Sequence, residues 1–253
     1  MVTPEAIAAD VHIFSKHWTD DRVAARASPC AVFDVCDDWF TRVHPVVRGI
    51  GDYYREMCGL CSVTCSSEAL AEIILEQTGK VAEVIPEPYE GPDGLPRELG
   101  EPLRVLWFGH KSNLKELQRH TVPDGVGVVL CTNAVGAGIV PWSVDNLALA
   151  LAACDVVIIP QSHHWKSANR MVESLRAGRF VVASDIPAYR GFDQYLGDIR
   201  EGLEWVKSNT GHIISRIISG RKRLDQFSPA SINRQWSSYI SGLVNGTSGI
   251  TST

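Results

Sequence analysis

Short apolar runs alternate with amphipathic segments along the first third of the chain. The runs are rich in Val, Ile and Phe, and the segments between them repeat apolar positions at helical spacing. The runs predict strands and the segments predict helices. The predicted strands are 10–16, 30–37, 61–66 and 80–88, and the predicted helices are 21–28, 46–60 and 67–79. Ser66 or Ser67 is the expected N-cap of the third helix, and Gly79 its expected end.

The same alternation restarts after residue 102. Strands are predicted at 103–110, 126–133, 155–160 and 180–186. Helices are predicted to start at 112, to cover 143–155 (opened by Ser143) and 166–178, and to finish the chain within 199–220 and 228–244. The strands are nearly continuous apolar runs, which is typical of parallel strands that are covered on both faces.

A stretch rich in Pro and Gly, from Pro86 to Pro102, separates the two halves and shows no periodicity. It predicts a linker. The sequence therefore predicts an α/β protein with two Rossmann-like parallel-sheet domains, in which ligands bind at the carboxyl ends of the strands and in the cleft between the domains. The predicted divisions are a first domain at 1–88, a linker at 89–102, a second domain at 103–245 and a disordered tail at 246–253.

The predicted helix 166–178 carries two different faces. Its apolar positions lie on one side, and its polar positions form one stripe of residues three or four apart, namely Lys166, Asn169, Arg170 and Glu173. The helix N-terminus follows a strand, where free backbone N–H groups favour an anion. Lys166 and Arg170 suit a phosphate, and Glu173 suits ribose hydroxyls, so the stripe matches a nucleotide diphosphate. The alternative is an ordinary surface ion pair between Arg170 and Glu173, worth about 0.2–0.5 kcal/mol.

The segment "KSANRMVESLRAGRFVVASDIPAYR" resembles the donor-binding segment of GT-B glycosyltransferases, especially the retaining enzymes of the large family four. That family's pattern has two acidic residues separated by seven others, then an Ala-rich helix end, a Gly and a strand close to "PVVAS". Glu173 stands at the second acidic position. "CDVVIIP" and "VLWFGH" resemble the family's preceding strand and the first strand of its donor domain.

The resemblance implies a GT-B fold and transfer of a sugar, of hexosyltransferase type, from a nucleotide-diphosphate donor. It implies retention of configuration, with neither a metal nor another cofactor. Lys166, Arg170 and Glu173 would be the catalytic residues, stabilising the leaving nucleoside diphosphate and holding its ribose. The donor would be bound by Gly109, His110, Lys166, Asn169, Arg170 and Glu173.

The chain departs from the family pattern at two places. Trp165 holds the first acidic position, which in the family contacts the transferred sugar. The N-terminal half is short, with four predicted strands and no opening strand followed by a Gly-rich turn, so the expected N-terminal domain is incomplete. These departures favour an alternative, a catalytically inactive nucleotide-sugar-binding or scaffold protein. A nucleotide-sugar epimerase is a more distant alternative, because no G-x-G-x-x-G follows the first strand.

Composition narrows the choice of partners. The formal net charge is −5, which argues against a general nucleic-acid binder. No apolar run approaches the ~20 residues that span a bilayer, and the first residues do not form a secretory signal. Seven scattered Cys indicate reduced thiols in the cytoplasm. The acceptor, whether a glycan, a lipid-linked molecule or a protein, is left open, and the basic run 219–224 is either a peripheral membrane contact or a solvated face.

Three other groups of residues have a functional and a structural interpretation. Asp34, Asp37 and Asp38 end a predicted strand and would line the acceptor site or cap the next segment. Cys58, Cys61 and Cys65 have the spacing of a cluster-binding loop but are better explained as buried thiols. A final set would reach the donor or be solvated, namely His163, His164, Lys111, Asn113 and Lys115.

Overall fold

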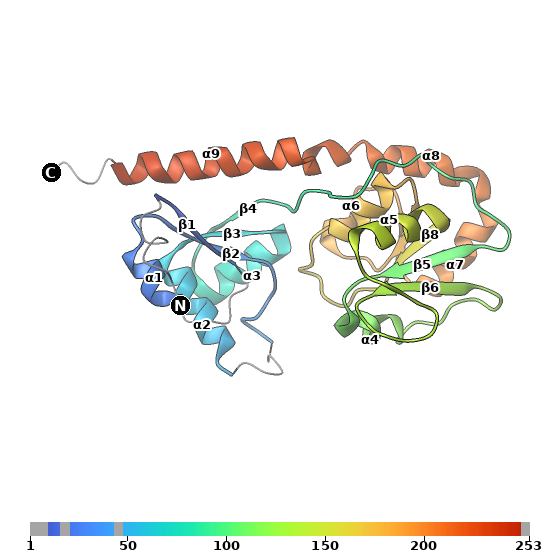
Figure 1. Ribbon diagram of the computed structural model, residues 1–253, viewed down its shortest axis with the longest axis horizontal. Helices are drawn as coiled ribbons and strands as arrows, with labels where there is room; N and C mark the ends of the chain where they lie inside the picture. The colour runs from blue at the N-terminus through green and yellow to red at the C-terminus, as the bar shows by residue number, and fades with distance from the viewer. Residues whose placement is uncertain (1–9, 16–20, 43–47, 249–253) are drawn as a thin grey trace. The chain divides into compact units, whose positions relative to one another are not determined.

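A computed structural model describes residues 10–15, 21–42 and 48–248, and the chain folds into two compact units. Unit 1 holds the described residues up to Glu87, together with Trp165–Ser167 and the residues from Ala230 onward. Unit 2 holds Pro88–His164 and Ala168–Pro229. The predicted linker is therefore part of unit 2, and the last helix, which was predicted to belong to the second domain, belongs almost entirely to unit 1 (Figure 1).

Unit 1 is built on a four-stranded parallel sheet in the order β1-β2-β3-β4. Its strands are β1 (His12–Ser15), β2 (Ala31–Val35), β3 (Ser62–Cys65) and β4 (Ala82–Val84). Its helices are α1 (Arg22–Ala27), α2 (Ile50–Leu60), α3 (Glu68–Thr78) and most of α9 (Pro229–Ser248). In Figure 1 the first three helices lie on one side of this sheet and α9 lies on the other. All four predicted strands are confirmed.

The core of unit 1 contains several aromatic rings. Phe33 on β2 meets Tyr54 on α2 edge to face, with ring centroids 5.0 Å apart. Trp165 joins this core with 2% of its surface exposed, and the Ser67 hydroxyl donates to its backbone carbonyl oxygen at 2.6 Å. Ser67 also caps α3, and Gly79 ends that helix in the left-handed conformation, as predicted.

Unit 2 is built on a six-stranded parallel sheet in the order β10-β9-β8-β5-β6-β7. Its strands are β5 (Arg104–Phe108), β6 (Gly127–Thr132), β7 (Ile139–Pro141), β8 (Val156–Ile159), β9 (Phe180–Ala183) and β10 (Tyr195–Leu196). The sequence predicts four of these strands but not the short edge strands β7 and β10. The order reverses at β5, because β6 lies on one side of it and β8 on the other.

Helices and short 3-10 turns complete unit 2. The helices are α4 (Leu114–Leu117), α5 (Val144–Ala153), α6 (Asn169–Arg176), α7 (Ile199–Ser208) and α8 (Thr210–Arg221). The turns are η2 (Lys111–Asn113), η3 (Pro187–Tyr189) and η4 (Leu224–Phe227). Ser143 caps α5 as predicted. No helix among the described residues has the length and hydrophobicity needed to cross a membrane.

Residues 89–100 form an extended strap that is bound along unit 2. The Gly94 N–H donates to the Arg176 carbonyl oxygen at 2.9 Å, and the Arg221 guanidinium bonds to Gly94 and Asp93. Packing is so close that a Cβ added at Gly178 would lie 2.2 Å from the Leu95 carbonyl oxygen. The predicted linker shows no periodic structure, and hydrogen bonds to helix ends hold it in place.

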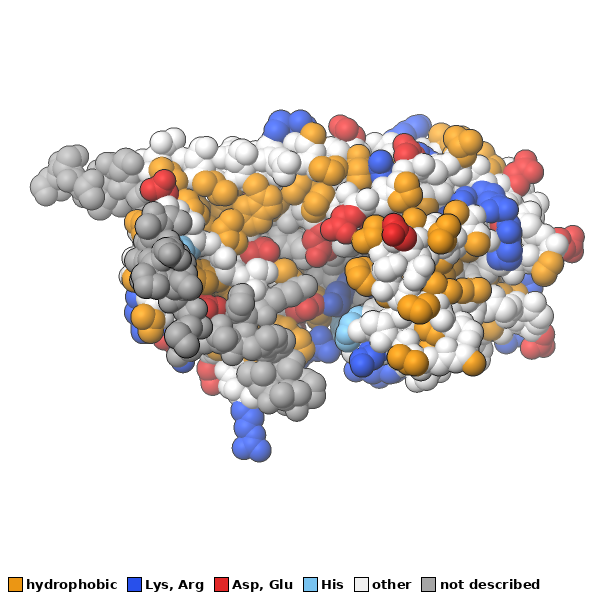
Figure 2. Space-filling view, viewed as in Figure 1, with side chains coloured by type: hydrophobic (Ala, Val, Ile, Leu, Met, Phe, Trp, Pro, Cys, Tyr) orange, Lys and Arg blue, Asp and Glu red, His pale blue; other side chains and the backbone are white. Residues whose placement is uncertain are grey.

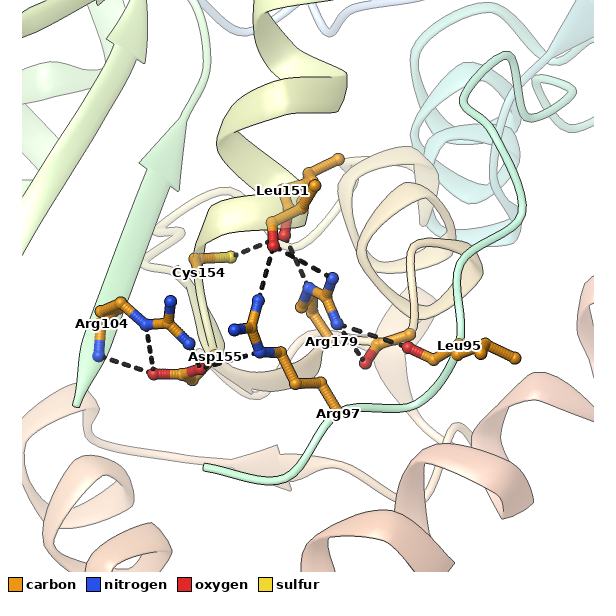
Figure 3. A network of polar contacts seen from close by, with 9 residues as sticks. Leu95, Arg97, Arg104, Leu151, Cys154, Asp155 and Arg179 are labelled. Carbon is orange, nitrogen blue, oxygen red and sulfur yellow. Dashed lines mark hydrogen bonds and ion pairs between the residues drawn. The ribbon is translucent and has the colours of Figure 1, made fainter. Parts of the chain in front are cut away.

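Figure 3 shows the polar network that ties the strap to the amino ends of the central strands. The Asp155 side chain is fully buried just before β8 and accepts bonds from the Arg104 backbone N–H and Nε, each at 3.0 Å. Arg97 of the strap lies 3.5 Å from the same carboxylate and donates to the Ala152 carbonyl oxygen at 2.7 Å. Burial by itself raises the pKa of Asp155, but the bonds from Arg104 outweigh it and hold the pKa below its ordinary value.

Replacing the Asp155 carboxylate tests this network. We expect Asp155→Asn to lower the free energy of unfolding by about 3 kcal/mol at pH 7, because an amide leaves Arg104 without its buried charge partner. The folded-state pKa of Asp155 lies below the unfolded value of about 3.9, so its stabilisation is complete above that pH and is lost as the pH falls through the folded-state pKa. The variant should therefore lose less stability in acid.

Urea unfolding between pH 7 and pH 3 measures both effects. The exposed Asp124 provides the matched control, and Asp124→Asn should change the free energy of unfolding little at either pH. Equal stability of Asp155→Asn and wild type at pH 7 would show that the network does not hold unit 2 together.

Candidate functional site

The strand-order reversal in unit 2 marks a place where a ligand can bind. In open parallel sheets, a crevice forms outside the carboxyl ends of the two strands that flank the reversal. Here these strands are β5 and β8, which are followed by Gly109 and by Gln161–His163. The N-terminus of α6 belongs to the same unit, because α6 connects β8 to β9. We take this carboxyl edge as the candidate site.

Arg170 lies in the first turn of α6 and reaches the end of β5. Its Nη1 donates to the Phe108 carbonyl oxygen at 3.4 Å. Among the residues that the structure describes, no carboxylate lies within ion-pair distance of this guanidinium. The alternative interpretation, an ion pair between Arg170 and Glu173, is therefore not what the described residues form. The positive charge of Arg170 adds to the helix dipole at the N-terminus of α6.

The loop after β5 is held in place by backbone and side-chain bonds. The Gly109 N–H donates to the Cys131 carbonyl oxygen at 3.2 Å, and the Lys111 N–H donates to the Asn133 side chain at 2.8 Å. His110 is exposed, and its Nδ1 accepts from the Ser112 N–H at 3.3 Å. The sequence analysis did not assign Asn133, although its position at the end of the predicted strand 126–133 is a signal for it.

The loop after β8 is held by Glu116 and Ser184. Burial by itself raises the pKa of Glu116, but a bond from Ser162 and the positive charge of Arg119 lower it below its ordinary value. Ser184, after β9, accepts from the Gln161 N–H at 2.9 Å. The loops at the carboxyl ends of the central strands are thus connected to one another.

The polar stripe predicted on helix 166–178 is only partly present. The helix starts at Asn169, so Lys166 precedes it, and Lys166 belongs to unit 1. There its Nζ lies 2.5 Å from the Asp37 carboxylate and 4.4 Å from the centroid of the Trp165 ring. The apolar side of the helix is buried as predicted, with Met171, Val172 and Leu175 in the core.

Glu173 was expected to face outward, but only 8% of its surface is exposed. Its two carboxylate oxygens accept from the backbone N–H groups of Glu90, at 2.6 Å, and Gly91, at 3.0 Å. Arg176, one turn on, donates to the Gly91 carbonyl oxygen at 2.7 Å and stacks over the Tyr89 ring at 3.9 Å. In this structure Glu173 therefore anchors the strap, and ribose binding by Glu173 stays a prediction.

The aspartates that end β2 have separate partners. Asp38 accepts from the Phe40 and Thr41 N–H groups at 3.0 and 3.1 Å, which confirms its capping interpretation. Asp37 pairs with Lys166. Asp34 accepts from the Thr64 hydroxyl at 2.8 Å. These bonds satisfy the aspartates within unit 1 and do not test an acceptor role.

The structure gives less support to a functional role for the cysteines, for a metal site or for the basic run. Burial raises the pKa values of Cys58, Cys61 and Cys65, as expected of structural thiols. Over residues 10–15, 21–42 and 48–248 there is no cluster of His, Cys, Asp and Glu that could hold a metal ion.

In the basic run 219–224, Arg221 binds the strap and Arg223 donates to the Arg190 carbonyl oxygen at 2.7 Å. On the face drawn in Figure 2, acidic and basic side chains are interspersed.

Comparisons with solved structures identify the fold. The chain superposes on sucrose-phosphate synthase from Thermosynechococcus elongatus with a TM-score of 0.72 and 10% identity, over 94% of this chain and 74% of that one. It superposes on the GtfA/B complex with a TM-score of 0.63 and 10% identity, over 93% and 57% of the two chains. For TarM the values are 0.60 and 12%, over 93% and 54%.

These likenesses confirm the prediction of a GT-B fold with two Rossmann-like parallel-sheet units. The chain spans a little over half of the GtfA/B and TarM chains and about three quarters of the synthase. No protein-family model and no curated protein sequence matches it. Because identity to the solved structures is 10–12%, the likeness establishes the fold, and activity has to be argued from the site.

The anchoring role of Glu173 can be tested without any ligand. We expect Glu173→Gln to lower the free energy of unfolding by about 1–3 kcal/mol, because the amide nitrogen has to face one of two backbone N–H donors that then lose their acceptor. We also expect faster proteolysis within residues 89–97. Urea unfolding and limited proteolysis measure these changes.

Glu201→Gln is the matched control, since Glu201 lies exposed on α7 in the same unit. If Glu173→Gln leaves both the stability and the proteolysis rate at wild-type values, the carboxylate is not an anchor.

Proposed function

We propose that this chain transfers a sugar from a nucleotide-diphosphate donor, and that the donor diphosphate binds at the N-terminus of α6. The observation that carries the proposal is Arg170, whose guanidinium stands at the carboxyl edge of the sheet and donates to the Phe108 carbonyl oxygen. The GT-B fold supports glycosyl transfer as the reaction class. A positive charge at this point suits a leaving nucleoside diphosphate, because electrostatic stabilisation of developing charge is a large part of catalysis.

The proposed donor site has three parts. Arg170 and the free N–H groups at the start of α6, next to Asn169, would face the diphosphate. Gly109, His110 and Lys111 would approach it from the loop after β5, where the bond between Lys111 and Asn133 fixes the backbone. Roles for Lys166 and Glu173 in donor binding stay predictions, since both side chains have other partners here.

The finer details belong to the proposal as well. Retention of configuration and independence from metal ions are expected from the resemblance, and a cytoplasmic site of action is expected from the scattered cysteines. The acceptor is a glycan, a lipid-linked molecule or a protein.

A nucleotide-sugar-binding protein without turnover is the second candidate function, and Trp165 favours it. This residue stands where the motif has its first acidic residue, so the motif's first carboxylate is missing. The Trp165 ring packs into the core of unit 1 instead.

Thermal unfolding with UDP, GDP, ADP and dTDP tests the proposed donor site. One of these ligands, at 100 times its dissociation constant, should stabilise the wild type by about 2.7 kcal/mol. Arg170→Gln should abolish most of this stabilisation because it removes the charge that faces the diphosphate. Arg200→Gln should preserve it, because Arg200 pairs with Glu204 on the surface of α7.

Turnover of the matching nucleotide sugar then separates the two candidate functions. Release of the nucleoside diphosphate supports the enzyme, whereas binding without release supports the binding protein. If no nucleoside diphosphate stabilises the folded wild type, the donor site is not where we place it.

A further inference from the structure

Two tryptophans and two cations come together in unit 1. The loop after β2 supplies Trp39 and Arg42, and a separate segment of the chain supplies Trp165 and Lys166. The Arg42 guanidinium lies over both rings, 5.2 Å from the centroid of Trp39 and 5.7 Å from that of Trp165. The Lys166 ammonium lies 4.4 Å from the centroid of the Trp165 ring. We call these four residues the cation cluster, because one indole ring holds two positive charges near each other.

The cation cluster carries more positive than negative charge. The Asp37 carboxylate accepts from Lys166 Nζ at 2.5 Å and balances that one charge. Within the described part of the chain, no carboxylate lies within ion-pair distance of Arg42, and no group accepts a hydrogen bond from its guanidinium. Contacts with the faces of aromatic rings do not use the N–H groups at the edge of a guanidinium. Arg42 is only half-buried, so these donors can reach a ligand.

Hydrogen bonds hold the cation cluster from two sides. In the loop after β2, Asp38 accepts from the Phe40 N–H at 3.0 Å, and Arg55 donates to the Phe40 carbonyl oxygen at 3.1 Å. On the other side, the Ser67 hydroxyl donates to the Trp165 carbonyl oxygen at 2.6 Å. Ser67 is the N-cap of α3, so the cluster lies near the positive end of that helix dipole.

We propose that the cation cluster is a binding site for a phosphate group, with Arg42 and Lys166 as the residues that contact it. The edge of a guanidinium can donate two parallel hydrogen bonds to a phosphate, and an ammonium adds a compact charge. A bound anion would also offset the repulsion between two cations that lie over the same ring.

This site lies within unit 1 and is therefore additional to the donor site that we propose in unit 2. Its existence does not depend on the donor site. Its biological role does rest on the proposed function: if the chain transfers a sugar, the phosphate at the cation cluster belongs to the acceptor, and the acceptor is a phosphorylated molecule.

Isothermal titration with inorganic phosphate and with glycerol 3-phosphate tests the site. Arg170→Gln serves as the reference protein, because it lacks the charge that we assign to the donor diphosphate. In that background, Arg42→Gln should bind both probes about tenfold more weakly, a difference of about 1.4 kcal/mol in binding free energy. Arg26→Gln is the matched control, since Arg26 is exposed in the same unit and pairs with Glu56 at 2.6 Å. It should bind both probes as the reference does.

A conservative variant separates binding from packing. Arg42→Lys keeps the charge but loses the planar pair of donors, so its phosphate affinity should fall between those of the reference and Arg42→Gln. Thermal unfolding shows whether each variant is folded. A lower melting temperature of Arg42→Gln with an unchanged phosphate affinity would mean that Arg42 only packs between the rings, and would overturn the inference.

The source of the phosphate can be a soluble molecule or a lipid headgroup. Co-sedimentation with vesicles of phosphatidic acid in phosphatidylcholine, compared with phosphatidylcholine alone, distinguishes the two. Binding to the phosphatidic acid vesicles that is lost in Arg42→Gln supports a lipid-linked ligand. Binding of glycerol 3-phosphate without binding to these vesicles supports a soluble one.

The outcomes keep this inference apart from the proposed function. If Arg42→Gln binds phosphate as the reference does, the cation cluster is not a phosphate site, and the donor site is judged by its own test. An equal loss in Arg26→Gln would indicate a general effect of surface charge and would also contradict the inference. If phosphate binding depends on Arg42 while no nucleoside diphosphate binds the wild type, the proposed function fails and the site in unit 1 stands.

Discussion

The buried carboxylate of Asp155 is the contact on which the architecture of unit 2 depends. It stands at the amino end of β8 and binds the backbone and guanidinium of Arg104 at the amino end of β5. It also reaches Arg97 in the strap. These are the two strands at which the sheet order reverses, and their opposite ends frame the candidate site. One charge network thus fixes the register and spacing of the elements that present Gly109 and the loop after β8.

Asp155 and Glu173 both hold the strap on unit 2, but they use different kinds of partner. Asp155 uses arginine side chains, whereas Glu173 accepts directly from backbone N–H groups. Both carboxylates are buried, so each would be costly to leave unpaired. Arg170 follows the opposite principle, since its contacts are neutral and its charge is not cancelled by any described carboxylate. Within unit 2, the two carboxylates that hold the fold are satisfied by close hydrogen-bond donors. The guanidinium at the candidate site has no described carboxylate partner.

The sequence predicts the parts of the fold that follow from periodicity. Eight apolar runs become strands, and Ser67, Gly79 and Ser143 bound helices where capping chemistry places them. The edge strands β7 and β10 are missed, since two or three residues are too few to show alternation. The strap is missed because its order comes from long-range contacts of its backbone with α6 and α8.

The sequence likewise predicts only part of the candidate site, namely the residues at strand ends and at a helix start. Gly109, Asn169 and Arg170 lie where strand ends and a helix start place them. The assignment of Glu173 as an exposed acceptor does not survive, because its partners are more than 80 residues away and no helical pattern shows them. Lys166 is misplaced on the helix since α6 begins three residues later, after Trp165 has entered the core of unit 1.

The division of the chain between the units has a consequence for its biosynthesis. The backbone passes from one unit to the other after Glu87, His164, Ser167 and Pro229. The first unit therefore obtains Trp165 and α9 only after the intervening segments of the second unit have been synthesised. An N-terminal fragment that stops at the strap lacks part of its own core, so this half of the protein has to wait for the C-terminal half before its folding can finish.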